Sequence, residues 1–294
     1  MKSGLQTLPS SERRFGAVWG SRLASLAILL LVLATAGCAK LKARDQLNKG
    51  VQSYKNSRYE EAIEHFKNAA SLDPGLLNAR LYLATAYAKL YIPGAETEEN
   101  RRMAYSAIEE YKRALEQNPG NINAIKGIAS LDVQLRNFEE AKQYYKKAAI
   151  VESNEPDNYQ AIAVIDWNTA YTFRQEQRSK LKLKPTDQLK DKRVCADVKA
   201  ANNGPVEEGI AMLQKALKIR PDYEDAMNYM NLLYRERADY QCDNPGARAA
   251  DMNAAYEWQD KVLAIRKAKI QKQQEKVGVS GIVIDDAKKD EKKQ

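Results

Sequence analysis

The stretch Ala43–Leu76 reads ARDQLNKGVQSYKNSRYEEAIEHFKNAASLDPGL, and it decides the fold. Ala62, Phe66 and Ala69 are four and three residues apart, so they share one face of a helix. SRYEEA marks a tight turn between this helix and the segment before it. Pro74 closes the unit, because a proline cannot continue a helix. The stretch predicts a helical hairpin with small residues where its helices touch and a bulky aromatic side chain between them.

The same spacing of small and aromatic residues recurs further along the chain. Ala141, Tyr145 and Ala148 repeat it 79 residues on, which is two periods of 34 and a surplus of 11. The middle copy accounts for the surplus, because YIPGAETEEN interrupts it before Ala107 and Tyr111. An irregular helical domain with accidental spacing is the alternative, but several copies in register disfavour it.

This period, with its Ala, aromatic, Ala and Pro pattern, resembles the tetratricopeptide repeat. The resemblance implies an all-α fold, a right-handed α-solenoid of about five helical hairpins over residues 43–267. The fourth and fifth repeats carry insertions at 176–204 and 239–249, and the last repeat serves as a cap. The expected repeats are 43–76, 77–121, 122–155, 156–223 and 224–267.

Residues 1–37 have the features of a secretory signal. Basic residues precede LASLAILLLVLATAG, an apolar run of 15 residues that is short for a membrane span. Small residues then lead into Cys38, which resembles the bacterial lipobox, although Thr35 stands where leucine is usual. The resemblance implies cleavage before Cys38, lipidation of its thiol, and a short linker over 38–42. An uncleaved anchor with an incidental cysteine is the alternative.

Ala39 follows the cysteine instead of the aspartate that often retains such lipoproteins at the inner membrane. We therefore expect a lipid-anchored protein of the bacterial cell envelope, at the outer membrane and facing the periplasm. Loss of residues 1–37 lowers the formal net charge from +8 to +5. The remaining positive charge is concentrated in 176–204 and in the end of the chain, so the high pI does not indicate a nucleic-acid partner.

Residues 268–294 form a charged segment with few apolar side chains, which predicts a disordered tail. GVSGIVID within it could add to a partner as a strand, but a coil is the favoured interpretation.

Cys195 and Cys242 both fall in the insertions between the first and second helices of a hairpin. Successive hairpins of a solenoid point such turns to the same edge, so the two insertions are expected to be neighbours. A disulfide between them suits an exported protein, and a pair of buried or free thiols is the alternative.

Signals for an enzyme are absent from the sequence, and no cofactor is expected. His65 is the single histidine and lies within a predicted helix, whereas Ser–His–Asp and Cys–His schemes both need a placed histidine. No His/Cys cluster predicts a metal site, and no glycine-rich loop predicts phosphate binding. The pairs Glu60–Glu61 and Glu139–Glu140 stand at helix starts, where they complement the helix dipole.

The first helices of stacked hairpins line a concave groove that can bind a helix or an extended segment. The family's carboxylate-clamp members use several Lys and Arg in this groove, but here only Lys126 and Arg235 suggest one. The predicted lining residues are Leu47, Val51, Tyr54, Leu81, Lys126, Val133, Trp167, Asn228, Leu232 and Arg235.

The favoured function is a non-enzymatic, membrane-anchored scaffold that binds another envelope protein or peptide. One alternative is a structural protein that self-associates or contacts the cell wall through its basic insertion and tail. Another is an accessory subunit of an envelope enzyme complex.

Overall fold

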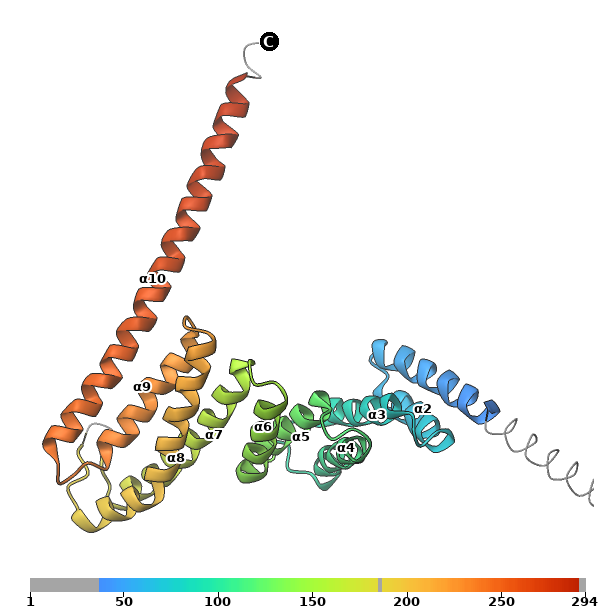
Figure 1. The fold of residues 1–294 in the computed structure, drawn as a ribbon, viewed down its shortest axis with the longest axis horizontal. Helices are drawn as coiled ribbons and strands as arrows, with labels where there is room; N and C mark the ends of the chain where they lie inside the picture. The colour runs from blue at the N-terminus through green and yellow to red at the C-terminus, as the bar shows by residue number, and fades with distance from the viewer. Residues whose placement is uncertain (1–36, 185–186, 291–294) are drawn as a thin grey trace, which may run out of the picture. The chain divides into compact units, whose positions relative to one another are not determined.

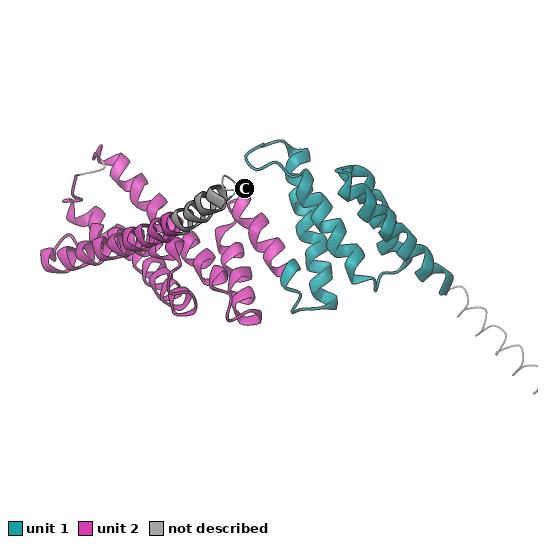
Figure 2. Cartoon of the chain, turned by 90° about the horizontal axis from the view of Figure 1, so that it is seen from above, with its two compact units in different colours: residues 1–124 teal, residues 125–294 magenta. Residues whose placement is uncertain are grey.

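The computed structural model describes residues 37–184 and 187–290, and all secondary structure in these ranges is helical (Figure 1). The predicted all-α fold is confirmed. The chain divides into two compact units, residues 1–124 and 125–294 (Figure 2). The predicted signal sequence lies outside the described residues, apart from its last residue.

Unit 1 contains two hairpins. A helix over residues 37–55 precedes α2 (Tyr59–Leu72), and α3 (Leu77–Leu90) is followed by α4 (Glu98–Gln117). The pattern that predicted these helices forms their core, because the side chains of Ala62, Phe66 and Ala69 are fully buried.

Phe66 occupies the space that Gly50 leaves open. A Cβ atom placed on Gly50 would lie 2.5 Å from a ring carbon of Phe66, which is too close for any real contact. The ring of Phe66 also stacks on Tyr82 of α3 at a centroid distance of 5.6 Å. Phe66 therefore joins three helices of the unit, and only glycine fits beside it on the first of them.

Unit 2 continues the alternation of first and second helices. Its helix α5 begins just ahead of the unit boundary, and α7 packs against α6, α8 and α9. The helices are α5 (Ile122–Gln134), α6 (Phe138–Val151), α7 (Pro156–Lys180), α8 (Lys192–Ile219), α9 (Glu224–Asp239) and α10 (Pro245–Asp290).

The same turn ends the first helix of three hairpins. Ser57, Arg136 and Lys182 have φ angles of 60°, 62° and 55°, the left-handed conformation that commonly follows a helix end. In each case the next amide donates a hydrogen bond to the carbonyl five residues back, at 2.8–3.1 Å. Ser57 and Arg136 are also 79 residues apart, so the turn follows the repeat found in the sequence.

The insertion predicted at 176–204 is mostly helical. It prolongs α7 to Lys180 and starts α8 at Lys192, which leaves 181–191 as the connection. Arg178 fixes this connection from the end of α7, because its guanidinium donates to the carbonyl oxygens of Lys184 and Asp187 at 2.5 and 2.8 Å. The fifth hairpin has a shorter connection between α9 and α10.

A disulfide joins the first turn of α8 to the connection between α9 and α10, and it is the bond that the sequence predicted. Cys195 and Cys242 are bonded, and Cys195 is buried among the apolar side chains of α7, α8 and α9. The bond closes a separation of 47 residues, for which loop entropy gives a stabilisation of about 4 kcal/mol. Cys38 is exposed and free.

Helix α10 differs from the predicted end of the chain. It runs on to Asp290, whereas a disordered tail was expected from residue 268. Apart from Ile270, residues 266–276 are arginine, alanine, lysine, glutamine and glutamate, which favour a helix once one has started. Lys261 is exposed, in agreement with an outer face that is open to water, and its ammonium lies 3.8 Å from the centre of the Trp258 ring.

Candidate functional site

The first helices of the last two hairpins bring three aromatic rings together. Trp167 of α7 stacks on Tyr171 at 5.1 Å, and Tyr229 of α9 meets Trp167 edge-on at 5.6 Å. Both Trp167 and Tyr229 are half-buried, while Tyr171 is 37% exposed. The Trp167 indole N–H has no acceptor among the described residues. We call Trp167, Tyr171 and Tyr229 the aromatic cluster.

A hollow of about 560 Å³ adjoins the aromatic cluster at Tyr171. It follows one stripe of α7, from Tyr171 and Thr172 to Ser179 and Lys180. Its hydroxyl, amide and charged groups stand next to an aromatic surface. Such a surface can hold the side chains and the backbone polar groups of a bound segment.

Three predicted residues extend the surface along α9. Asn228, Leu232 and Arg235 are four and three residues apart, so they share one face, and each is half-exposed. Tyr229 lies three residues before Leu232, which connects this face to the aromatic cluster. The guanidinium of Arg235 bonds to the Asn231 side chain at 3.0 Å and lies 5.2 Å from the Tyr256 ring centre.

Ion pairs hold α7 and α9 together below the aromatic cluster. Arg174 donates two hydrogen bonds to the Glu236 carboxylate, at 2.6 and 2.8 Å, and a third to Asp239 at 3.2 Å. Arg178 also donates to Asp239, at 3.1 Å. Glu236 and Arg178 are buried, so these bonds fix how α7 and α9 lie side by side. The aromatic cluster and the α9 residues therefore form one rigid surface, which we call the α7–α9 face.

The predicted lining residues of unit 1 belong to its core. Leu47, Val51 and Tyr54 are half-buried and pack against the cluster that contains Phe66 and Leu83. They hold the first hairpin to α2 and α3, so they offer less free surface than the groove prediction implied. Leu81 is half-buried on α3, and its carbonyl accepts the Thr85 hydroxyl.

The predicted residues of α5 lie apart from the α7–α9 face. Val133 is half-buried. The Lys126 ammonium donates to Glu152 at 2.6 Å, so its charge is already paired. Of the two suggested clamp cations, Lys126 is therefore held by a carboxylate of the chain itself, while Arg235 bonds through its Nε to the neutral Asn231 side chain.

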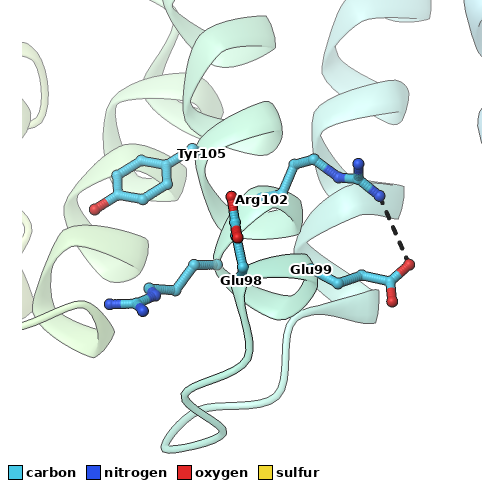
Figure 3. A pocket seen from close by; sticks show the side chains of 5 residues that line it. Glu98, Glu99, Arg102 and Tyr105 are labelled. Atoms are coloured by element: carbon cyan, nitrogen blue, oxygen red, sulfur yellow. Dashed lines mark ion pairs between the residues drawn. The ribbon is translucent and has the colours of Figure 1, made fainter.

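A second hollow, of about 800 Å³, lies beside the start of α4 in unit 1 (Figure 3). Glu98, Glu99, Arg101, Arg102 and Tyr105 line it, and Figure 3 shows Arg102 directed toward Glu99. Their ion pair spans 3.6 Å, and both side chains are more than two-thirds exposed, so water screens it. This hollow offers solvated charges and one tyrosine.

An ionic group that the repeat pattern does not predict lies between α6, α7 and α8. Lys142 donates to Asp166 at 2.8 Å and to Glu208 at 3.1 Å, and Lys146 pairs with Glu208 at 2.5 Å. Asp166 is 1% exposed, and one of its carboxylate oxygens has no partner among the described residues. A Cβ on Gly209 of α8 would lie 3.3 Å from the Asp166 Cβ, so the helices approach closely at this point.

Burial raises the pKa of Asp166 to about 6, and the hydrogen bond and charge of Lys142 offset only part of this rise. Burial also acts to lower the pKa of Lys142, but the bonds and charges of Asp166 and Glu208 outweigh it, and the net shift is upward. Asp166 and Lys142 are buried, Glu208 and Lys146 reach the surface, and the group lines none of the hollows described above. Its geometry therefore supports a structural role.

Two further absences hold within the part of the chain that the structure describes. No three His, Cys, Asp or Glu side chains gather closely enough there to hold a metal ion. None of the helices in that part combines the length and the apolar character that a membrane span requires.

Residues 105–164, from α4 to the start of α7, match the sequence model of the tetratricopeptide repeat family. Within this stretch the chain resembles tetratricopeptide repeat proteins. Tetratricopeptide repeat protein 8 of Mus musculus is 28% identical to it over 123 residues, which are 42% of this chain and 21% of the mouse protein. The match therefore spans about a fifth of that relative's length.

Two solved structures share the fold at low sequence identity. A crystal structure of MamA protein has a TM-score of 0.53 and 14% identity, and the match covers 78% of this chain and 94% of MamA. MamA 41-end from Desulfovibrio magneticus RS-1 has a TM-score of 0.50 and 13% identity, with 77% and 96% covered. The tetratricopeptide resemblance and the solenoid predicted from sequence are confirmed. This fold indicates a scaffold for protein–protein interaction.

Proposed function

We propose that this chain is a non-enzymatic scaffold, anchored by lipid at Cys38, that binds a segment of another cell-envelope protein. The α7–α9 face is the binding surface. The single observation that carries the proposal is the aromatic cluster: three contiguous rings, only partly covered, on a surface that buried ion pairs hold rigid. Partly exposed tryptophan and tyrosine are the residues that most often dominate binding energy at interfaces.

The expected ligand is an amphipathic helix or an extended peptide. Its apolar side chains would cover the aromatic cluster and Leu232, while its polar groups meet the hydroxyl and amide groups of α7. Arg174 and Arg178 are neutralised by Glu236 and Asp239, so the surface does not select strongly for an acidic peptide. Rigidity of the surface reduces the entropy lost on binding.

Tyr171→Ala is expected to weaken partner capture at least tenfold, because an exposed aromatic contact at the centre of the surface is lost. Partner capture is measured as the amount of partner that is crosslinked to the full anchored chain in its own envelope and recovered with it. Tyr105→Ala is the matched control: it removes a 52% exposed tyrosine from α4, outside the face, and should leave recovery unchanged.

Trp167→Ala should have a larger effect on capture, provided that thermal melting shows the fold intact. An envelope partner recovered equally well with wild-type and Tyr171→Ala protein would refute the proposed surface. If self-crosslinks or purified cell wall accounted for all recovery, the structural alternative would replace the scaffold.

Cys38→Ser is expected to release the protein from the membrane fraction. A thiol supplies the site of lipidation, and one acyl chain alone anchors only marginally, whereas two or three hold a protein firmly. Mass spectrometry of the mature N-terminus should find a lipid-modified cysteine at position 38. A mature chain that starts at any other residue would refute the anchor and leave the binding surface untouched.

A further inference from the structure

Helix α10 carries partly exposed apolar side chains beside the face that packs against its own hairpin. Val262, only 3% exposed, faces the interior of the unit. Tyr256, Leu263 and Ile270 are 49%, 54% and 55% exposed and stand seven residues apart, so they form one stripe along the helix. We call these three residues the outer stripe.

The outer stripe continues past the end of the hairpin. Arg266 and Lys269 both bind Glu224, the first residue of α9, at 2.9 and 2.6 Å. From there α10 runs on without α9 beside it (Figure 1). A single helix in water gains little stability by itself, so a long helix of this kind depends on packing. Its apolar stripe is where a covering element would pack.

Charged residues beside the stripe indicate which element covers it. Asp260 and Lys267 are exposed, and neither makes an ion pair among the described residues. They lie three residues before and four residues after Leu263, and the helical period places both on the same edge of the outer stripe. The arrangement of apolar and charged groups is thus nearly symmetric about Leu263, but with opposite charges at its two ends.

We propose that the outer stripe binds α10 of a second copy of this chain, antiparallel, with the two-fold axis at Leu263. Because the rise per residue is the same in both helices, Leu263 then lies opposite Leu263 of the second copy, and Tyr256 lies opposite Ile270 of the second copy. Asp260 meets Lys267 of the second copy, and the symmetry makes this pair twice. A parallel arrangement would set Lys267 level with Lys267 and lose both pairs. The outer stripe borders the α7–α9 face, because Tyr256 contacts Arg235, but the dimer does not require the proposed function.

Cysteine crosslinking of the full chain in its own membrane distinguishes the two arrangements. Under mild oxidation, Leu263→Cys is expected to form a disulfide-linked dimer that a reductant separates, because the two-fold axis places the two thiols next to each other. Tyr256→Cys alone should form little, whereas Tyr256→Cys mixed with Ile270→Cys should form it readily. Wild-type protein controls for any crosslink through Cys38. Tyr256→Cys dimers as abundant as those of Leu263→Cys would indicate parallel pairing and overturn the proposal.

Charge exchange supplies a second test, which does not depend on thiols. Lys267→Asp replaces two attractions by two repulsions, so the dimer dissociation constant of the detergent-solubilised full chain should rise about tenfold. Adding Asp260→Lys restores both pairs and should return the constant to within about twofold of wild type. Ile150→Ala, at an 81% exposed side chain of α6, is the matched surface control. A monomeric wild-type chain, or a double variant no tighter than Lys267→Asp, would refute the dimer.

Discussion

Phe66→Ala is expected to lower the free energy of unfolding of unit 1 by about 3–5 kcal/mol. The side chain is fully buried, and its ring fills the space between α2, Gly50 and Tyr82 of α3. Truncation removes the apolar area from the core and leaves a cavity that three helices cannot close without moving. Denaturant unfolding followed by circular dichroism measures the loss, with the two units fitted as separate transitions.

Gly50→Ala tests the same contact from the other side. Alanine normally favours a helix over glycine by up to about 1 kcal/mol, but here its Cβ would collide with the Phe66 ring. We therefore expect destabilisation by about 1–3 kcal/mol. Gly246→Ala is the matched control, because a Cβ on this helical glycine of α10 makes only an ordinary contact, 3.6 Å from the Asn244 side-chain oxygen, and it should be neutral or stabilising. Stabilisation by Gly50→Ala would show that the ring does not fill this space.

The repeat pattern predicted most of the fold because it reports local packing. Ala62, Phe66 and Ala69 recur at fixed offsets, and each offset corresponds to a side chain that touches the neighbouring helix. Cys195 and Cys242 could be paired for the same reason, since the solenoid brings successive connections to one edge.

What the repeat pattern left out depends on contacts between residues far apart in the sequence. Arg178 is buried because Asp239 lies 61 residues away to receive it, and no local period predicts that bond. Likewise, the aromatic cluster needs Tyr229 beside Trp167, which only the packing of α9 on α7 provides. The helical course of 176–204 was missed because its many lysines resemble those of a solvated loop.

One signal for the buried ionic group was present in the sequence. In three of the other second helices, the residue directly after the first small residue of the repeat pattern is a buried isoleucine. These are Ile63, Ile108 and Ile210, which are 5%, 6% and 5% exposed. Lys142 stands at this position in α6. A lysine at a buried position of a repeat requires a carboxylate opposite, and Asp166 is that carboxylate.

Lys142→Met is expected to cost about 3–5 kcal/mol of unfolding free energy at pH 8, because it leaves Asp166 charged and buried without its cation. The loss should shrink as the pH falls. Burial already raises the pKa of Asp166 to about 6 in the folded wild type, against about 4 in the unfolded chain. The folded state therefore binds the extra proton between these values, and the contribution of Asp166 to stability decreases as the pH rises through this range.

Removing Lys142 also removes the group that lowers this pKa most, so Asp166 of the variant should take up its proton at a higher pH than in wild type. At pH 5 Asp166 is largely protonated in both proteins, and the difference between them should be smaller than at pH 8 by about 1–2 kcal/mol. Glu208 keeps its bond to Lys146 and changes little. Lys142→Met combined with Asp166→Asn removes the unpaired charge and should recover about half of the loss at pH 8. Equal losses at pH 5 and pH 8 would mean that the packing of the lysine stem, and not the charge of Asp166, carries the effect.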